Sequence, residues 1–173
     1  MNTEWLYTID DSGETMLSRL SKSSRMDLIS MLFLQEVDDT LKSIANLSPL
    51  HRAAYWGYED AVQELLQKGA DPNQRDRLGE TPLHKAVRLG NEAAAKVLID
   101  GGAELEAQTD MGLTPLHWAV LTGQIEMAEL LIRKGANVHI RDWVTGGMTP
   151  LDFARLLKYR ELTELLQRHT AVW

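Results

Sequence analysis

Several residue types are scarce or absent in this chain of 173 residues, and each shortage excludes a class of protein. There is no cysteine, so neither a disulfide framework nor a thiolate metal site is available. Apolar runs such as 31–34 are far too short to span a bilayer, which needs about 20 residues. Acidic residues outnumber basic ones by 25 to 18, and the net charge of −7 argues against a general affinity for phosphate backbones. Residues 1–11 lack the basic start of a signal peptide, and we expect a soluble protein of the cytoplasm or nucleus.

Recognisable catalytic motifs are also missing. The chain has no Gly-x-Gly-x-x-Gly, no phosphate-binding loop, no His-Glu-x-x-His and no Gly-x-Ser-x-Gly. The paired carboxylates at 10–11 and 38–39 fall in predicted loops, where we expect solvated charge rather than acid–base chemistry. The sequence therefore predicts neither an enzyme nor a bound cofactor.

A four-residue phrase, in contrast, recurs at a nearly constant interval. It reads Ser-Pro-Leu-His at 48–51, Thr-Pro-Leu-His at 81–84 and 114–117, and Thr-Pro-Leu-Asp at 149–152. Successive copies start 33, 33 and 35 residues apart. A period in this range indicates stacked units, each of which buries its apolar face against its neighbours.

One unit can be followed from 81 to 113. Thr81 is placed to cap a helix that begins with Pro82, where the missing N–H costs nothing, and Gly90 is suited to end that helix. A second helix is predicted over Glu92–Asp100, followed by an extended finger, 103–113, that leads into the next capping threonine. Each unit is therefore predicted to be a helix, a turn, a second helix and a finger.

This pattern resembles the ankyrin repeat, in both the phrase and the period. The resemblance implies an all-α ankyrin-repeat solenoid of about five stacked helix-turn-helix units with extended fingers, including degenerate terminal caps. We expect a single domain. Its predicted parts are an N-terminal tail 1–14, a degenerate capping repeat 15–47, repeats 48–80, 81–113 and 114–148 (the last with a finger insertion), and a truncated C-terminal capping repeat 149–173. An unrelated helical extension remains the alternative for the N-terminal segment.

The histidines of the phrase, His51, His84 and His117, invite comparison with a metal site. Equivalent residues of stacked units lie about 8–10 Å apart, whereas zinc ligands must converge within about 2 Å of one ion. By resemblance, these histidines tie neighbouring repeats together through hydrogen bonds. No metal site is predicted.

The resemblance also implies a concave face, formed by the first helices and fingers, and a convex face formed by the second helices. Basic residues are projected to the concave side, namely Arg52, Lys68, Arg75, Arg77, Lys85, Arg88 and Arg141, while acidic residues such as Glu59, Glu92, Glu126 and Glu161 fall on the second helices. Aromatic and arginine side chains are enriched in interface hot spots. The predicted partner-binding residues are Tyr55, Trp56, Arg75, Arg77, Leu78, Arg88, Trp118 and Trp143. The alternatives are ordinary surface charge and, for Trp118 and Phe153, a place in the core.

These observations favour a monomeric, non-enzymatic interaction module. It would scaffold, sequester or inhibit a protein partner through its concave face, and the basic strip there favours an acidic partner. The alternative is an adaptor that links a client to a degradation or signalling complex through residues 1–46. A nucleic-acid partner is disfavoured by the net charge.

Overall fold

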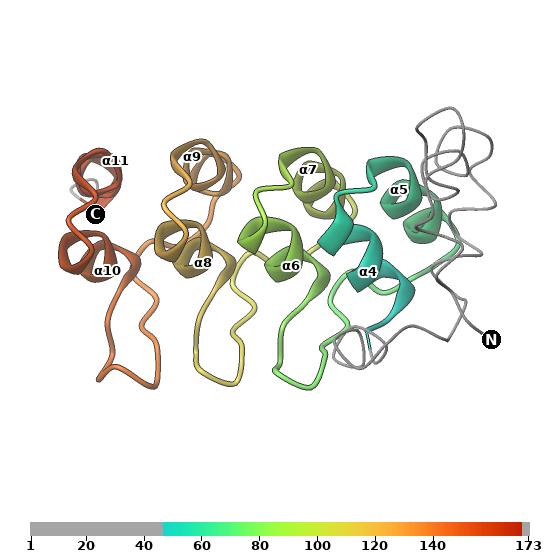
Figure 1. Cartoon of the computed structure of the whole chain (residues 1–173), viewed down its shortest axis with the longest axis horizontal. Helices are drawn as coiled ribbons and strands as arrows, with labels where there is room; N and C mark the ends of the chain where they lie inside the picture. Colours follow the sequence, from blue (N-terminus) through green and yellow to red (C-terminus); the bar gives the residue numbers. More distant parts are fainter. Residues whose placement is uncertain (1–46, 171–173) are drawn as a thin grey trace, which may run out of the picture.

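The computed structural model describes residues 47–170, and within this range the backbone forms eight helices and no strand (Figure 1). The helices form four antiparallel pairs: α4 (Pro49–Trp56) with α5 (Glu59–Gln67), α6 (Pro82–Arg88) with α7 (Glu92–Asp100), α8 (Pro115–Leu121) with α9 (Ile125–Arg133), and α10 (Pro150–Leu156) with α11 (Arg160–Thr170). The predicted tail 1–14 and residues 15–46 of the predicted capping repeat lie outside the described residues. The all-α repeat solenoid is confirmed.

Three of the four pairs, those that begin at Thr81, Thr114 and Thr149, start with the same capping box, and at Ser48 the hydroxyl group accepts from His51 N at 3.4 Å. The side chain of the first phrase residue faces the amide of the fourth, as in the bonds from His117 N to Thr114 Oγ1 (3.4 Å) and from Asp152 N to Thr149 Oγ1 (3.3 Å). The fourth residue accepts in return: Thr114 N donates to His117 Nδ1 (3.1 Å) and Thr149 N donates to Asp152 Oδ2 (3.0 Å). This reciprocal capping box satisfies amides at the helix start that have no partner within the helix. Aspartate therefore replaces histidine at the last copy of the phrase without loss of the cap.

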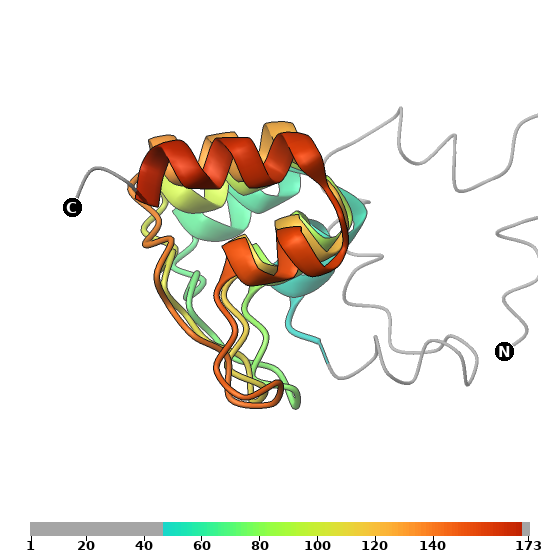
Figure 2. The same ribbon diagram turned by 90° about the vertical axis from the view of Figure 1, so that its left-hand side faces the viewer.

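The pairs stack side by side through one continuous apolar core. The first helices α4, α6, α8 and α10 form one row, in which each packs against the next (Figure 1). The second helices α5, α7, α9 and α11 form the other row, in which α5 packs against α7 and α9 packs against α11. A small residue shared by all four units lets the first helices approach closely, and it is fully buried in each: Ala53, Ala86, Ala119 and Ala154. The fingers 68–80, 101–113 and 134–148 all leave the stack in the same direction (Figure 2).

The predicted histidine bonds between repeats are present. His51 Nε2 lies 3.0 Å from the carbonyl oxygen of Glu80, His84 Nε2 lies 3.1 Å from that of Leu113, and His117 Nε2 lies 3.3 Å from that of Met148. Since Nδ1 of His84 and His117 accepts from the capping amide, Nε2 carries the proton and donates to the next unit. Each imidazole is therefore neutral, with both nitrogens engaged in the scaffold.

The C-terminal unit carries polar residues in slots that are apolar elsewhere. Arg155 takes the slot of the fully buried Val87 and Val120, and Gln167 takes that of the buried Ile132. Lys158 adopts φ 61° in the slot held by glycine in the other three units, a conformation that side chains rarely occupy. These substitutions make this unit more polar than the others, as is expected of a cap, and the assignment as a cap stays a prediction.

The buried histidines predict that acid destabilises the fold before its carboxylates are protonated. Burial lowers the pKa of His84 to about 4, and burial also lowers the pKa of His51 and His117. The unfolded chain takes up these protons near pH 6.5, but folded His84 cannot do so until about pH 4. Stability is therefore complete above pH 6.5 and falls as the pH is lowered toward 4, with His84 alone contributing on the order of 3 kcal/mol.

Urea midpoints measured between pH 7.5 and 4.5 check this expectation. His84→Gln keeps a donor and an acceptor but does not titrate, so its midpoint should depend less on pH than that of the wild type. The exposed His139→Gln is the matched control and should keep the wild-type slope. A wild-type midpoint that stays constant across this range would contradict the buried, neutral state of the histidines.

Candidate functional site

The first helices are bordered by two rims at their opposite ends. The first helices α6, α8 and α10 each follow a described finger directly, so the fingers lie at their N-terminal ends, and the turn to the second helix lies at the C-terminal end of every first helix (Figure 2). The fingertips, defined as residues 75–79, 108–112 and 141–147, form the first rim. The turns at and after the ends of the first helices, residues 56–58, 89–91, 122–124 and 156–159, form the second.

Large exposed apolar side chains are confined to these rims in residues 47–170. Four lie on the fingertips and five on the turns: Leu78, Met111, Trp143 and Val144, then Trp56, Leu89, Leu156, Leu157 and Tyr159. None of them lies on the second helices α5, α7, α9 or α11. The second helices instead expose acidic side chains, including Glu59, Glu126, Glu129 and Glu161. The apolar surface available to a partner is therefore on the face that carries the first helices and fingers.

Each fingertip is built around one buried oxygen-bearing side chain. Asp76 accepts from the amides of Leu78 and Glu80, both at 2.9 Å, and Thr109 Oγ1 occupies the same slot in the next finger, where it accepts from Leu113 N at 3.2 Å. The third finger uses Asp142. A side chain that accepts from nearby amides holds the loop in a fixed turn.

The two-residue insertion of the third finger is accommodated around Asp142. This carboxylate is 3% exposed and accepts from the amides of Thr145, Gly147 and Met148 and from the hydroxyl of Thr145. Burial raises the pKa of Asp142, but these hydrogen bonds outweigh it and lower the pKa below its ordinary value. The insertion is thus an ordered turn organised by one ionised carboxylate.

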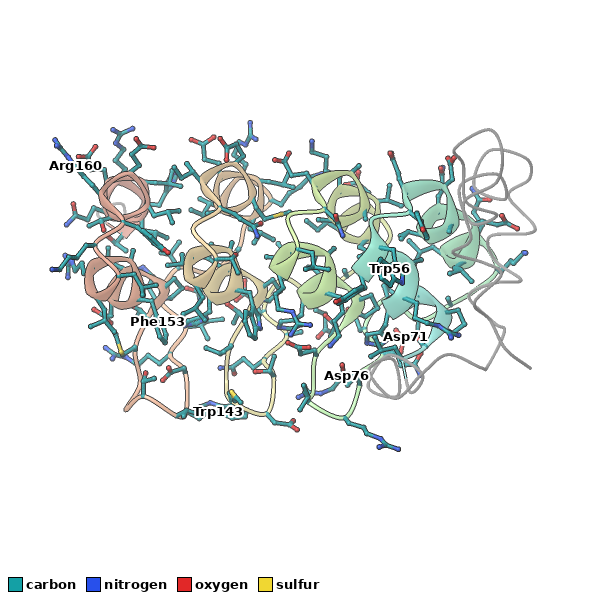
Figure 3. All side chains as sticks on the ribbon, viewed as in Figure 1. Trp56, Asp71, Asp76, Trp143, Phe153 and Arg160 are labelled. Carbon is teal, nitrogen blue, oxygen red and sulfur yellow. The ribbon has the colours of Figure 1, made fainter. Side chains whose placement is uncertain are left out.

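Trp143 projects from this finger at a fixed position (Figure 3). Its amide donates to the carbonyl oxygen of Met111 at 3.0 Å, and its ring packs over Gly112 of the preceding finger. A Cβ added at Gly112 would lie 2.6 Å from the backbone nitrogen of Trp143 and 2.7 Å from Cγ of its ring. The side chain is nevertheless 62% exposed, so the structure presents a large aromatic surface whose backbone is already immobilised.

A buried cluster of charges lies beneath the first fingertip, 75–79, and was not predicted from the sequence. Lys85 is 4% exposed and bridges Asp76, at 2.6 Å, and Glu80; Arg88 also reaches Glu80, at 3.4 Å. Burial raises the pKa of Asp76, but the hydrogen bond from Lys85 and those from the backbone lower it overall. The expectation that Lys85 is an available cation on the concave side is wrong, because these two carboxylates neutralise it in the interior.

A signal for this cluster was present in the repeat alignment. Glu80 precedes the capping threonine, and the corresponding residues of the other units are apolar: Leu47, Leu113 and Met148. A carboxylate in a slot that is otherwise apolar requires a buried partner. The first helix supplies that partner at Lys85, where the neighbouring units have Arg52, Trp118 and Phe153.

The predicted binding residues separate into three groups. Trp56 is 49% exposed and stands edge-on to the half-buried Tyr55, with ring centroids 5.1 Å apart, on the turn rim (Figure 3). Fingertip residues form the second group: Arg75, Arg77, Leu78 and Trp143. The third group, Arg88 and Trp118, lies on the first helices, with the Arg88 guanidinium carbon 5.4 Å from the Trp118 ring centroid.

Three other outcomes concern Lys68 and Arg88, which were projected to the concave side, and Phe153, for which the core was the alternative. Lys68 caps the second helix α5 and pairs with Glu64 at 2.6 Å, so it does not lie on the concave side. Phe153 is buried and packs edge-on against His117, which makes it a core residue. Arg88 is only partly open, since its side chain is 30% exposed and engages Glu80. The exposed positive charge is therefore found at the fingertips rather than along the whole concave side.

Comparisons with known proteins agree with this architecture. The family model described as "Ankyrin repeats (3 copies)" matches residues 3–76 and 50–142, and the chain therefore belongs to the ankyrin repeat family. An ankyrin repeat protein of Rickettsia felis is 38% identical over 69 residues, which is 39% of this chain and 23% of that protein. The first family match includes the segment 15–46, although the boundaries predicted for that unit stay a prediction. Ankyrin repeats are generally protein–protein interaction modules, and within residues 47–170 every helix is too short or too polar to span a bilayer.

The buried charge cluster predicts a large difference between breaking it and replacing it. Lys85→Met leaves Glu80 buried without its closest cation and should lower the free energy of unfolding by about 3–5 kcal/mol. The triple variant Asp76→Thr/Glu80→Leu/Lys85→Met leaves none of the three charges of this pairing, since Thr109 serves the Asp76 slot in the next finger, and it should recover most of that loss. Chemical denaturation of both variants checks this, and equal losses in the two would contradict the pairing.

The contact between Gly112 and Trp143 predicts a position-specific cost for a methyl group. Gly112 and Gly135 both have positive φ, 78° and 101°, but nothing lies within 4 Å of a Cβ at Gly135. Alanine at either position carries the same kind of backbone strain, while only Gly112→Ala also collides with Trp143. Thermal and urea unfolding should therefore show Gly112→Ala to be less stable than Gly135→Ala by about 1–3 kcal/mol. Equal stabilities would show that Trp143 is not held against this glycine.

Proposed function

We propose that this protein is a non-enzymatic binding module that scaffolds, sequesters or inhibits a protein partner through the face formed by its first helices and fingers. The observation that carries this proposal is that the large exposed apolar side chains of residues 47–170 lie only on the two rims of that face. Exposed apolar surface rimmed by polar residues is typical of interaction sites. The second helices carry an acidic surface on the opposite, convex side, and such charge favours contact with water.

The rims provide the residue types that dominate interface energies. Trp56 on the turn rim is 49% exposed, and Trp143 on the fingertips is 62% exposed. Leu78 and Met111 add flexible apolar area to the fingertips. Tryptophan is enriched among hot-spot residues, because a large ring buries much area for little loss of rotamer freedom. Because the two rims lie at opposite ends of the first helices, a partner that contacts both rims would also lie across these helices.

The scaffold is organised before any partner arrives. The fingertip turns are held by side chains that accept from their amides, and the fingers are bonded to one another by Asp110 N to Leu78 O and Trp143 N to Met111 O, both at 3.0 Å. Binding to such a surface loses little conformational entropy on the side of the repeat protein. The function proposed is therefore rigid docking, with affinity from a few anchors spread over several repeats.

Site-specific photo-crosslinking in the native cells tests this function. A photoreactive amino acid at Leu89 or Met111, on the two rims, should yield adducts to a discrete protein partner, whereas the same group at Lys96 or Glu129, on the second helices, should not. The adducts should disappear in a Trp56→Ser/Trp143→Ser double variant that retains the wild-type melting temperature. Adducts of equal yield from the second helices, or persistence of the rim adducts in the double variant, would contradict the proposal.

A further inference from the structure

The fingertips carry a row of apolar side chains that repeats with the units of the fold. Leu78, Met111 and Val144 occupy one slot of three successive fingers, 33 residues apart, and are 57%, 53% and 65% exposed. Trp143 stands beside Val144 and is 62% exposed. We call these four residues the fingertip ridge. Leu78, Met111 and Val144 lie outside the apolar core, so core packing does not explain why this slot is apolar in all three fingers.

The hydrogen bonds between fingers give the ridge a fixed spacing. The carbonyl groups of Leu78 and Met111, themselves ridge residues, accept from the amides of the next finger at 3.0 Å. Successive fingertips are therefore in contact and follow the stacking of the helix pairs, which places neighbouring helices about 8–10 Å apart. An incoming chain would meet one apolar side chain per repeat at about this interval.

We propose that the fingertip ridge binds an extended segment of a partner protein in the polyproline II conformation, with an apolar side chain at every third position and acidic residues between. This inference rests on the proposed function and specifies the chemistry of the partner. Polyproline II has three residues per turn and rises about 3.1 Å per residue, so every third side chain returns to the same face after about 9 Å. That distance matches the spacing of the ridge.

Other backbone conformations fit the ridge less well. In a β-strand, side chains three positions apart point to opposite faces, so they cannot all meet one row. An α-helix matches the interval only at every second turn, and helix recognition uses an apolar groove that receives a broad helix face. The ridge has one exposed apolar slot per finger, and the same fingertips carry the exposed Arg75, Arg77 and Arg141.

Charge on the same fingertips decides between acidic and basic partners. These three arginines are exposed on the fingertips, whereas Asp76 and Asp142 are turned inward to hold the loops. The exposed carboxylate there, Asp110, lies 3.5 Å from Arg75. Arg141 is held at the tip by its bond to the Gly147 carbonyl oxygen at 2.7 Å. Although the chain as a whole has a charge of −7, the surroundings of the ridge are positive and favour acidic residues in the bound segment.

Fluorescence anisotropy with synthetic peptides and the full chain tests the proposal. The probe is a labelled peptide of repeated Leu-Pro-Glu triplets, long enough to cross three fingers, and we expect saturable binding. A Leu-Pro-Lys peptide should bind at least tenfold more weakly. An acidic helical peptide with leucine at every seventh position should also bind at least tenfold more weakly, because the broad face of a helix does not fit one exposed apolar side chain per finger.

Variants of the chain show where the peptide binds. Met111→Ser and Val144→Ser should each weaken binding by roughly fivefold or more, the scale of an interface anchor. Gln63→Ser is the control, since Gln63 is uncharged and exposed on the second helix α5, away from both rims, and it should leave the affinity unchanged. Circular dichroism melts confirm that all three variants stay folded.

Each contrary result would overturn the inference. These are no binding of the Leu-Pro-Glu peptide, equal or tighter binding of the helical peptide, equal or tighter binding of the lysine peptide, or an equal loss in Gln63→Ser. The crosslinking experiment is independent of these peptides. Rim adducts combined with a failed peptide would retain the binding function and reject this partner chemistry, whereas failed rim adducts would reject the function itself.

Discussion

The bond from each phrase histidine to the carbonyl group of the next unit is the constraint on which the rest of the structure depends. His84 joins two successive repeats. Its Nδ1 accepts from the capping amide of its own helix, and its Nε2 faces the carbonyl group of Leu113, just before the next first helix. The same ring therefore starts one repeat and positions its successor. It works only as a neutral imidazole, and burial maintains that state by lowering the pKa of His84 to about 4.

This arrangement separates the parts of the chain that must be constant from those that are available for recognition. The caps, the buried alanines and the histidine bonds occupy the interior of the stack, and they leave the fingertips and the turns without a structural duty toward the core. Exposed apolar residues accumulate at those two places in residues 47–170 and are absent from the second helices. A stack of nearly identical units thus obtains an individual surface without a change in its scaffold.

The interior is not uniform either, as the cluster of Asp76, Glu80, Lys85 and Arg88 shows. A carboxylate has entered a slot that other units fill with apolar residues, and a lysine from the adjacent helix neutralises it. Such clusters cost desolvation energy and are retained only where the geometry is good. Arg88 contacts both Glu80 of this cluster and the ring of Trp118, so the buried carboxylate also helps to position side chains at the neighbouring surface.

The resemblance to ankyrin repeats implied the structural role of the histidines, whereas the sequence by itself determined the repeat and the starts of the four first helices. These depend on local chemistry, such as the cap at Thr81, the proline after it and the glycine at 90, and local chemistry can be read at a fixed period. It also indicated that Trp56 and Trp143 would be exposed, as they are. Those predictions required only knowledge of the slot that each residue occupies.

Only the tertiary structure decided which charges are available and which aromatic rings are held in place. Lys85 and Arg77 look alike in sequence, but one is buried between carboxylates and the other is exposed on a fingertip, because side-chain pairing across a turn depends on three-dimensional approach. Likewise, the glycine at 112 became the support of Trp143 only when two fingers came into contact. Periodicity determines where the backbone goes, whereas the contacts between neighbouring units determine what the surface presents.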